Sequence, residues 1–495
     1  MLFLLLIVLL ITLIYYKVKQ KHSHWEKLGV KHLKPTFYFG NFDRVMFRMA
    51  SFNQELIRVY ESFPNERYVG MYMFTTPILI IRDPEVLKSV FVKDFEHFVD
   101  HRPIVPESAD PIWTKNLFTL KGAAWKEMRS TLSPTFTSSK MRLIFVLITE
   151  TVQHHISYLT DNKVDKIELI DTFERFTNDV IASVAFGIKC DSINDRDNEF
   201  YAMAKKFTTI GFKETLVFIA YSLFPMICKY LGLNLSPNDA RKFLYDVIVE
   251  TIKIREKDGT NRPDMITLLM EEKKQREKLN EKPLGNEEIV AQAFIFLFAG
   301  FNTVANALSF CIYELSRNEQ VQRKLQQEID ETLSKNGKLT YENLIKMKYI
   351  DQVISETFRL YLPALAFDRV CTKTYTIEPK SPSEKPLTLN PGDLVWAAIP
   401  GLQKDKNYFP NPEDFDPERF ADGVNSYAYM PFGIGPRMCI GARLALMEIK
   451  TYIIELLSRY DVTWIHPEPA KYSKKSFELR FEGNVWVQLT PRIKK

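Results

Sequence analysis

The sequence predicts a mainly α-helical protein with a small β part, built around one long central helix. Three observations predict this fold class. Apolar residues recur with the helical period through most of the chain after residue 84. Residues 287–317 contain no proline, and their apolar middle suits a helix that passes through a large domain. Runs rich in β-branched and aromatic residues are few, near residues 67–82 and 477–489, so we expect two small β-sheets.

The composition indicates one large globular unit. Of the 495 residues 46% are apolar, and no Gly/Ser-rich or Pro-rich linker divides the chain after its N-terminal region, so we expect one domain over residues 42–495. The net charge of +5 is too weak and too dispersed to indicate a nucleic-acid partner. Five scattered cysteines without a C-x-x-C pair indicate a reducing environment that faces the cytosol.

The N-terminus has the pattern of a membrane anchor. Residues 1–16 carry no charge and are followed by Lys17, Lys19 and Lys21. As a helix they span about 24 Å, somewhat less than a ~30 Å hydrocarbon core. A cleaved signal peptide is the alternative, but no small-x-small cleavage site follows the apolar run. We therefore expect a retained anchor at 1–16, a basic hinge at 17–41, and a body on the cytoplasmic side.

The other elements follow from local patterns. Residues 67–82 predict a hairpin with its turn at 75–77. The charge-dense stretches 191–199 and 271–282 are expected to be solvated loops or exposed helix ends. The centre of the long helix, 293–301, is too short for a membrane span and is bracketed by Gln292 and Asn302. Helices are also predicted at 85–95, 123–132, 141–160, 169–186, 199–207, 240–257, 350–360 and 442–459.

The ten residues from Phe432 to Gly441 (FGIGPRMCIG) predict a metal site. They present one cysteine, Cys439, just ahead of the predicted helix at 442–459. A helix N-terminus and a nearby cation, Arg437, both favour the thiolate form, which is a good ligand for iron. The alternative is a buried structural cysteine in a turn.

The motif Phe-x-x-Gly-x-Arg-x-Cys-x-Gly is the haem-binding signature of the cytochromes P-450, and every specified position is met here. The chain therefore resembles that family, and most closely its insect microsomal members that oxidise xenobiotics. The resemblance implies a single large cytochrome P-450 type fold that binds haem b, with Cys439 as the axial ligand of the iron and Phe432 beside it in the loop.

The central helix carries the segment Ala299-Gly300-Phe-Asn302-Thr303. A glycine inside a helix costs about 1 kcal/mol relative to alanine, which suggests that small residues at 299 and 300 let a flat macrocycle approach. The Thr303 hydroxyl is able to bond a local carbonyl. In the family this segment is the oxygen-activation motif, and Thr303 matches the threonine that assists proton delivery. The alternative is an inert threonine on a packed helix.

Asn302 departs from the family pattern, which ordinarily has Asp or Glu before that threonine. An amide does not titrate, so it cannot carry a proton from solvent as a carboxylate can. We therefore expect either slower proton delivery through water or a chemistry that needs fewer protons. If proton delivery limits turnover, Asn302→Asp should raise the product formed per NADPH.

Glu356 and Arg359 lie at i, i+3 on one face of a predicted helix, a spacing that alone is weak evidence. In the family this pair joins a second arginine, matched here by Arg419, in a buried cluster that fixes the haem loop. The resemblance thus implies that all three residues are structural, not catalytic.

Haem propionates are carboxylates that need cations or hydrogen-bond donors. Trp125 and Arg129 lie at i, i+4 on one helix face, and the family uses this pair for a propionate. Arg369, Arg437 and His101 match further propionate contacts. Each alone is equally compatible with a surface cation, but the set favours ligand contact.

The resemblance also implies which residues line the substrate pocket. The expected lining comes from the loop 104–117, the segment 207–224 and the hairpin near Phe477, and from the central helix and the segment after residue 363. In the last two, the residues are Phe298, Phe301, Ala364, Leu365, Ala366 and Phe367. Almost all of the lining residues are apolar or aromatic, which predicts a lipophilic ligand.

The function implied by the resemblance is a monooxygenase that uses O2 and electrons from NADPH. The chain has no Rossmann, P-loop or flavin motif, so the electrons are expected from the NADPH cytochrome P-450 reductase, with cytochrome b5 as a second candidate donor. The implied location is the endoplasmic reticulum membrane. One alternative is a hydroperoxide isomerase or dehydratase of the same haem-thiolate type, which needs no reductase. The other is a haem-binding protein without catalysis.

Overall fold

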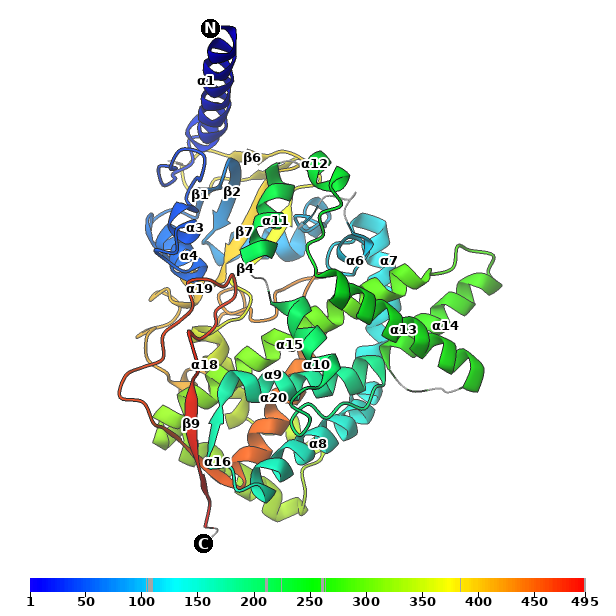
Figure 1. Cartoon of the computed structure of the whole chain (residues 1–495). Helices are drawn as coiled ribbons and strands as arrows, with labels where there is room; N and C mark the ends of the chain where they lie inside the picture. The colour runs from blue at the N-terminus through cyan, green and yellow to red at the C-terminus, as the bar shows by residue number, and fades with distance from the viewer. Residues whose placement is uncertain are drawn as a thin grey trace.

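A computed structural model gives the structure of the chain over residues 1–103, 105, 110–209, 212–223, 225–259, 262, 264–382 and 384–493. The body is mainly helical, and a β-rich part lies at the end from which the N-terminal helix projects (Figure 1). The expected fold class is confirmed.

The largest sheet has four strands in the order β1-β2-β7-β4. The predicted hairpin is confirmed, because β1 (Tyr68–Met73) pairs antiparallel with β2 (Thr76–Ile81). Strand β7 (Leu394–Ala398) is parallel to β2, and β4 (Ala366–Val370) is antiparallel to β7. The sheet therefore brings segments from both halves of the sequence to one end of the molecule.

The described residues form three sheets where the sequence predicted two. One contains β3 (Lys166–Glu168), β9 (Trp486–Pro491) and β8 (Tyr460–Trp464); the other contains β5 (Tyr375–Ile377) and β6 (Leu387–Leu389). The predicted hairpin at 477–489 is confirmed only near Phe477, where Tyr472 and Phe481 form an antiparallel bridge; β9 pairs instead with β3 and β8. A strand pattern predicts a strand but not its distant partner, which explains the error.

The predicted helices are all present, with ends shifted by a few residues. The charge-dense stretch at 271–282 includes the exposed half of a helix, and 191–199 is a loop up to Asn198. The helices other than α1 and α15 are α2 (His24–Lys27), α3 (Asp43–Met46), α4 (Phe52–Glu61), α5 (Pro84–Lys88), α6 (Pro111–Thr114), α7 (Gly122–Leu132), α8 (Ser138–Asp161), α9 (Leu169–Ile181), α10 (Glu199–Thr208), α11 (Phe212–Leu223), α12 (Pro225–Tyr230), α13 (Asn238–Asp258), α14 (Met265–Lys278), α16 (Glu319–Asn336), α17 (Tyr341–Leu344), α18 (Tyr349–Leu360), α19 (Ile399–Gln403) and α20 (Ala442–Leu457).

Helix α15 (Asn286–Arg317) crosses the middle of the body, as predicted (Figure 1). It packs against α9, α20 and several other helices, and most of its side chains are buried. By length and composition it could cross a membrane, yet 67% of its most apolar window is buried inside the protein. It is therefore the core helix of the domain.

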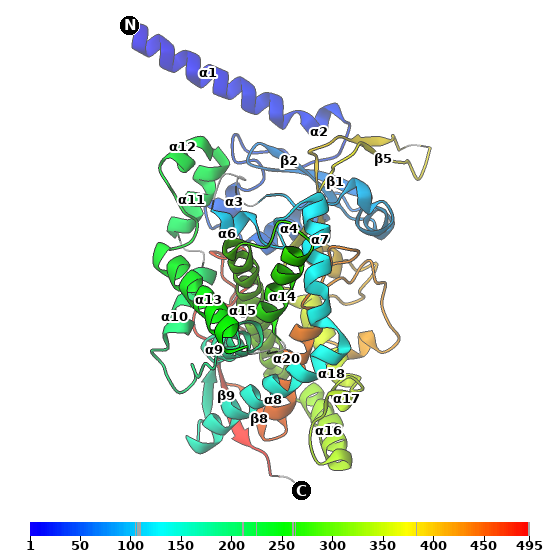
Figure 2. The same ribbon diagram turned by 90° about the vertical axis from the view of Figure 1, so that its right-hand side faces the viewer.

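Helix α1 (Leu2–His22) projects away from the body, and its apolar side chains are exposed (Figure 2). The helix continues beyond residue 16, so the predicted hinge begins inside it. The hinge is then fixed to the first strand by Trp25, whose indole N–H donates to the carbonyl of Met71 at 3.0 Å. A Cβ at Gly70 would lie 2.5 Å from the Trp25 ring, so only glycine allows this contact.

One buried acid on α20 gives a prediction for stability against pH. The carboxyl group of Glu448 is buried and one of its oxygens has no hydrogen-bond partner, and burial raises its pKa from 4.5 to about 8. An acid with a raised pKa in the folded state destabilises the fold as pH rises from its unfolded pKa to its folded pKa. Glu448→Gln should therefore have little effect near pH 5 and raise the unfolding temperature increasingly up to about pH 8.

Thermal unfolding of the full-length protein at several pH values measures this effect. Glu468→Gln is the matched control, because Glu468 is exposed and its replacement should show no such dependence. Equal pH profiles for the Glu448→Gln variant and the unmodified protein would contradict the prediction.

Candidate functional site

The cysteine loop is held in a fixed shape by its backbone. The Cys439 N–H donates to the carbonyl of Phe432 at 2.8 Å, which closes the loop. Gly435 has a φ of +74°, and a Cβ there would lie 2.0 Å from the carbonyl oxygen of Phe91. The loop therefore requires glycine at this position in order to dock against the segment around Phe91.

The Cys439 side chain is exposed even though the surrounding protein desolvates it. Both observations hold if the thiol faces an open space inside the body. Burial raises the pKa of the thiol, whereas the N–H of Gly441 and the charge of Arg129 oppose this rise. Arg129 also donates to the carbonyl of Met438 at 3.0 Å, so α7 is joined to the loop. A metal cation bound to the sulfur would hold it as a thiolate.

The side chain of Arg437, in the loop, contacts Trp125 of α7. The guanidinium carbon of Arg437 is 4.0 Å from the centre of the Trp125 ring, a cation–π contact. Arg437 also donates to the carbonyls of Val99 at 2.9 Å and Leu120 at 2.8 Å. Its only described carboxylate neighbour within 4 Å is Asp100, at 3.6 Å. The positive charge is thus buried and only partly compensated.

Arg369 and His101 lie beside that charge. His101 Nδ1 is 2.9 Å from a carboxylate oxygen of Asp368, and its ring stacks on Phe118 at 4.3 Å. Arg369 donates to the carbonyl of Asp368 at 2.6 Å, but its Nε is buried without a hydrogen-bond partner. Burial lowers the pKa of Arg369 to about 10, and burial together with the Arg369 charge lowers that of Arg437 to about 9. Two buried guanidinium groups side by side favour an anionic ligand.

One face of α15 is open to the interior. Ala299 is exposed, and its neighbours Phe298 and Gly300 are half-buried. The Thr303 hydroxyl donates to the Ala299 carbonyl at 2.5 Å, which confirms the predicted local bond. Gly300 differs from its predicted role, because a Cβ there would lie 2.9 Å from the Ile181 side chain. Close packing between α15 and α9 therefore accounts for this glycine.

Phe301 and Asn302 point away from that face. Phe301 is fully buried, with its ring 6.1 Å from that of Tyr201, and its carbonyl accepts a hydrogen bond from Thr177 at 3.0 Å. It is a core residue, so its predicted place in the pocket is wrong. The Asn302 amide is buried and donates to the carbonyl of Thr208 at 3.1 Å. The Asn302 side chain thus joins α15 to the end of α10. This contact does not support the catalytic role predicted for Asn302.

The other predicted pocket residues divide in the same way. Phe298 is half-buried, with its ring 5.3 Å from that of Trp113. Ala364 is exposed, and Ala366 and Phe367 are half-buried in β4, whereas Leu365 is buried in the main core. The expectation for Leu365 is therefore wrong. Of the loop and the segment also expected here, residues 104, 106–109, 210, 211 and 224 lie outside the described residues.

The charged cluster formed by Glu356, Arg359 and Arg419 is buried. Arg359 donates to both carboxylate oxygens of Glu356 at 2.6 and 2.8 Å, and both side chains are fully buried. Arg419 approaches the same carboxylate at 3.3 Å. Arg359 further donates to the carbonyls of Pro412 at 2.7 Å and Asp414 at 3.0 Å. The cluster thus ties α18 to the segment that leads to the cysteine loop.

Comparison with known proteins places this site in a family. The family model described as Cytochrome P450 matches residues 32–482. The chain belongs to the cytochrome P450 family. "Cytochrome P450 9e2" from Blattella germanica is 42% identical over 95% of this chain and 94% of that protein. "Probable cytochrome P450 9f2" from Drosophila melanogaster is 35% identical over 97% of each chain. "Cytochrome P450 6j1" from Blattella germanica is 34% identical over 96% of this chain and 95% of that protein.

The residues of this cytochrome P450 fit the haem that the family implies. An exposed thiol that the surrounding protein desolvates suits an iron ligand, and the exposed Ala299 leaves room for a flat group beside α15. The unpartnered Nε of Arg369 and the partly compensated Arg437 suit the carboxylates of a propionate pair. His101 is already engaged with Asp368, so its propionate contact stays a prediction.

Asp368 was missed at the sequence level. Its carboxylate lies 2.9 Å from His101 Nδ1 and accepts from the backbone N–H of Arg102 at 2.5 Å. Nearby positive charges and these hydrogen bonds lower its pKa although burial opposes this. The available signal was a carboxylate directly beside Arg369 in a short strand. Asp368 thus orients the basic side chains of the cytochrome P450 site.

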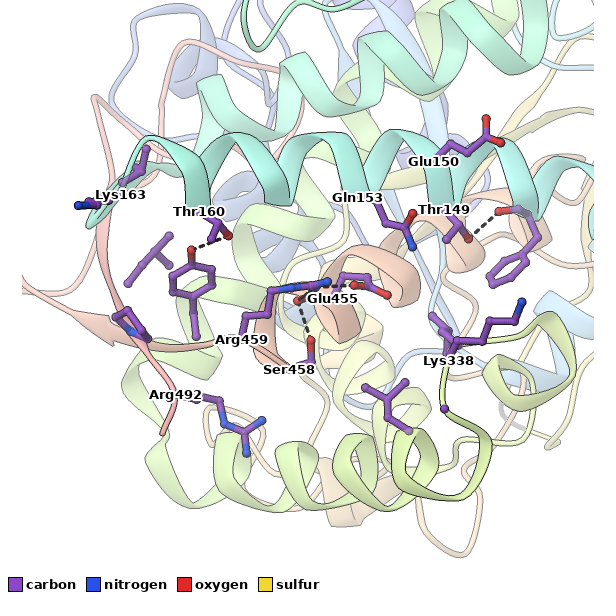
Figure 3. A pocket seen from close by; sticks show the side chains of 18 of the residues that line it. Thr149, Glu150, Gln153, Thr160, Lys163, Lys338, Glu455, Ser458, Arg459 and Arg492 are labelled. Carbon is purple, nitrogen blue, oxygen red and sulfur yellow. Dashed lines mark hydrogen bonds and ion pairs between the residues drawn. The ribbon is translucent and has the colours of Figure 1, made fainter. Parts of the chain in front are cut away.

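A cavity of about 980 Å³ lies at the opposite end of the cytochrome P450 body from α1, between α8, α16, α20 and β9 (Figure 3). None of the predicted site residues lines it. Its two arginines pair with protein carboxylates, Arg459 with Glu455 and Arg492 with Asp330. The haem residues described above lie elsewhere.

Proposed function

We propose that this cytochrome P450 is a monooxygenase that inserts one oxygen atom from O2 into a lipophilic small molecule, such as a xenobiotic, a hormone or a lipid. The other oxygen atom leaves as water, and the two electrons come from NADPH through the NADPH cytochrome P450 reductase, with cytochrome b5 as a second candidate donor. The observation that carries this proposal is the interior Cys439 thiol, presented by a loop that meets the whole haem-binding signature. When bound, a thiolate-ligated haem favours cleavage of the O–O bond in dioxygen.

The protein side chains would divide the remaining work. Cys439 would ligate the iron, and Trp125, Arg129, Arg369 and Arg437 would hold the propionates. The Thr303 hydroxyl, which donates to the Ala299 carbonyl, would turn from that bond to pass a proton at the open face of α15. The apolar pocket residues would exclude water and orient a lipophilic substrate.

The proposed location is the endoplasmic reticulum membrane, with the catalytic body on the cytoplasmic side. Helix α1 supports this, because its apolar side chains are exposed and Lys17, Lys19 and Lys21 follow the apolar run. Helix α12 lies at the same end of the body as α1 (Figures 1 and 2). Large apolar side chains at this end are also exposed, namely Met226, Ile227, Tyr230 and Leu231. Such a surface suits contact with a lipid headgroup region.

Reconstituted turnover of a lipophilic test substrate checks the proposed reaction. We expect product only when NADPH, O2 and the reductase are all present. A hydroperoxide isomerase would instead convert a lipid hydroperoxide equally well without NADPH and reductase. That outcome would replace the proposed monooxygenase.

The Asn302→Asp variant gives a second prediction. A carboxylate cannot donate to the Thr208 carbonyl, so we expect a loss of about 1–3 kcal/mol in the free energy of unfolding. Because residue 302 points at α10, we expect no increase in product formed per NADPH. Thermal unfolding and coupled turnover of the variant measure both effects.

Asn286→Asp is the matched control, because residue 286 begins the same helix, where a negative charge is favourable. It should leave both stability and turnover nearly unchanged. A rise in product per NADPH for Asn302→Asp alone would show that residue 302 does limit proton delivery.

A further inference from the structure

One carboxyl group, that of Glu478, contacts α15 and has no cation within ion-pair distance among the described residues. The side chain of Asn306 donates to Glu478 Oε2 at 3.4 Å. The Glu478 residue as a whole is half-buried, and burial of its carboxyl group raises the pKa of that group to about 7. The bond from Asn306, which is itself buried, places this carboxyl group against α15 inside the body.

Glu478 lies over the same face of α15 as the oxygen-activation segment. Ala299, Thr303 and Asn306 follow each other at i, i+4 and i+7, so they form one stripe along the helix. Seven residues of helix correspond to about 10 Å. The carboxyl group therefore marks one end of a face whose other end is the exposed Ala299. Phe477, the residue before Glu478, is among those expected to border the substrate pocket.

The neighbouring charges do not neutralise this carboxyl. Arg480, two residues on, makes its ion pair with Glu174 at 2.5 Å. Lys205 Nζ forms an ion pair with the other carboxylate oxygen of Glu174, at 2.8 Å. Burial raises the pKa of Glu478 and the negative charge of Glu174 adds to this rise, whereas the positive charge of Arg480 opposes it only in part. In the described part of the chain no cation lies within ion-pair distance of Glu478.

We propose that the Glu478 carboxylate anchors a cationic group of the substrate, so that this enzyme selects lipophilic molecules that carry a positively charged amine. The inference rests on the proposed monooxygenase function, since it names the substrate class of that site. A buried carboxylate without a cationic partner is unfavourable, and a ligand cation would supply the missing positive charge. The surrounding apolar side chains would hold the rest of the ligand, with the amine about 10 Å from the end that lies at Ala299.

A ligand with a permanent positive charge tests the proposed anchor, because its own charge does not change over the pH range that is compared. Phenylhexyl trimethylammonium carries such a charge and has no free nitrogen lone pair for the iron, and phenylhexanol is its neutral counterpart. Equilibrium dialysis would measure the binding of both by the full-length haem-loaded protein in neutral-lipid nanodiscs, with empty nanodiscs as the blank. Because only the ionised carboxylate attracts the cation, affinity for the cationic probe should rise about tenfold from pH 6 to pH 8.

Glu478→Gln should remove this rise and lower the affinity for the cation at pH 8 about tenfold, with phenylhexanol binding unchanged. Glu482→Gln is the matched control, because it removes an exposed carboxylate from the same segment and should leave both affinities as they were. The proposal is overturned if the unmodified protein does not bind the cation, or if Glu478→Gln binds it as before. It is also overturned if Glu478→Gln affects only the product formed per NADPH, which would make the group a proton donor.

The reduced carbon monoxide spectrum of each variant separates this inference from the proposed function. A red-shifted band together with unchanged cation binding would reject the role of Glu478 alone. An unshifted band in the unmodified protein would instead reject the thiolate-ligated haem on which the proposed function depends.

Discussion

Cys439→Ser is expected to abolish monooxygenase turnover while the protein still folds. The serine hydroxyl does not ionise near neutral pH, so it cannot supply the anionic sulfur ligand that the site presents. The loop backbone should persist, because the bond from residue 439 N–H to the Phe432 carbonyl does not involve the side chain. Turnover with NADPH and reductase, haem content and circular dichroism measure these effects.

Cys190→Ser is the matched control. Cys190 donates to a side-chain oxygen of Asn198 at 3.2 Å, a bond that serine is able to keep. This variant should retain haem and turnover. Comparable turnover in the Cys439→Ser variant would show that the reaction does not depend on the thiolate.

Glu356→Ala is expected to cause the largest loss of stability. The change leaves the fully buried guanidinium of Arg359 without its carboxylate partner, and it also removes the acceptor for the Asp416 N–H at 3.0 Å. Breaking a buried ion pair in this way costs about 3–5 kcal/mol. We expect a lower unfolding temperature and poor haem retention, because the cluster positions the segment before the cysteine loop.

Glu319→Ala removes an exposed pair with Arg323, whose nitrogen lies 3.6 Å away, and serves as the comparison. Exposed pairs contribute about 0–1 kcal/mol, so this variant should unfold close to the unmodified protein. Equal losses for the two variants would contradict the structural role of Glu356.

Local patterns in the sequence were sufficient for much of the fold. The helical period located α15 and most other helices, because amphipathic spacing is a local property. The hairpin of β1 and β2 was also predicted, since its two strands are joined by a short turn. By contrast, β9 pairs with strands from distant parts of the chain, and no local pattern specifies such partners.

The sequence predicted some residues of the site correctly and others not, and helix α15 shows the physical reason. Its centre is apolar on all sides, so the sequence does not reveal which face borders the interior space. Ala299 and Thr303 lie on that face, whereas Gly300 packs on Ile181 and Phe301 lies in the core. The partner of Asn302 is Thr208, which is 94 residues away in the chain. The structure was therefore needed to show that the Asn302 side chain joins two helices.

The absorption spectrum of the reduced protein under carbon monoxide tests the central claim most directly. If Cys439 ligates a haem iron as a thiolate, the reduced complex should show the strongly red-shifted Soret band of thiolate-ligated haem. The Cys439→Ser variant should lack this band. A haem-loaded, folded protein whose Soret band is not shifted would contradict the account.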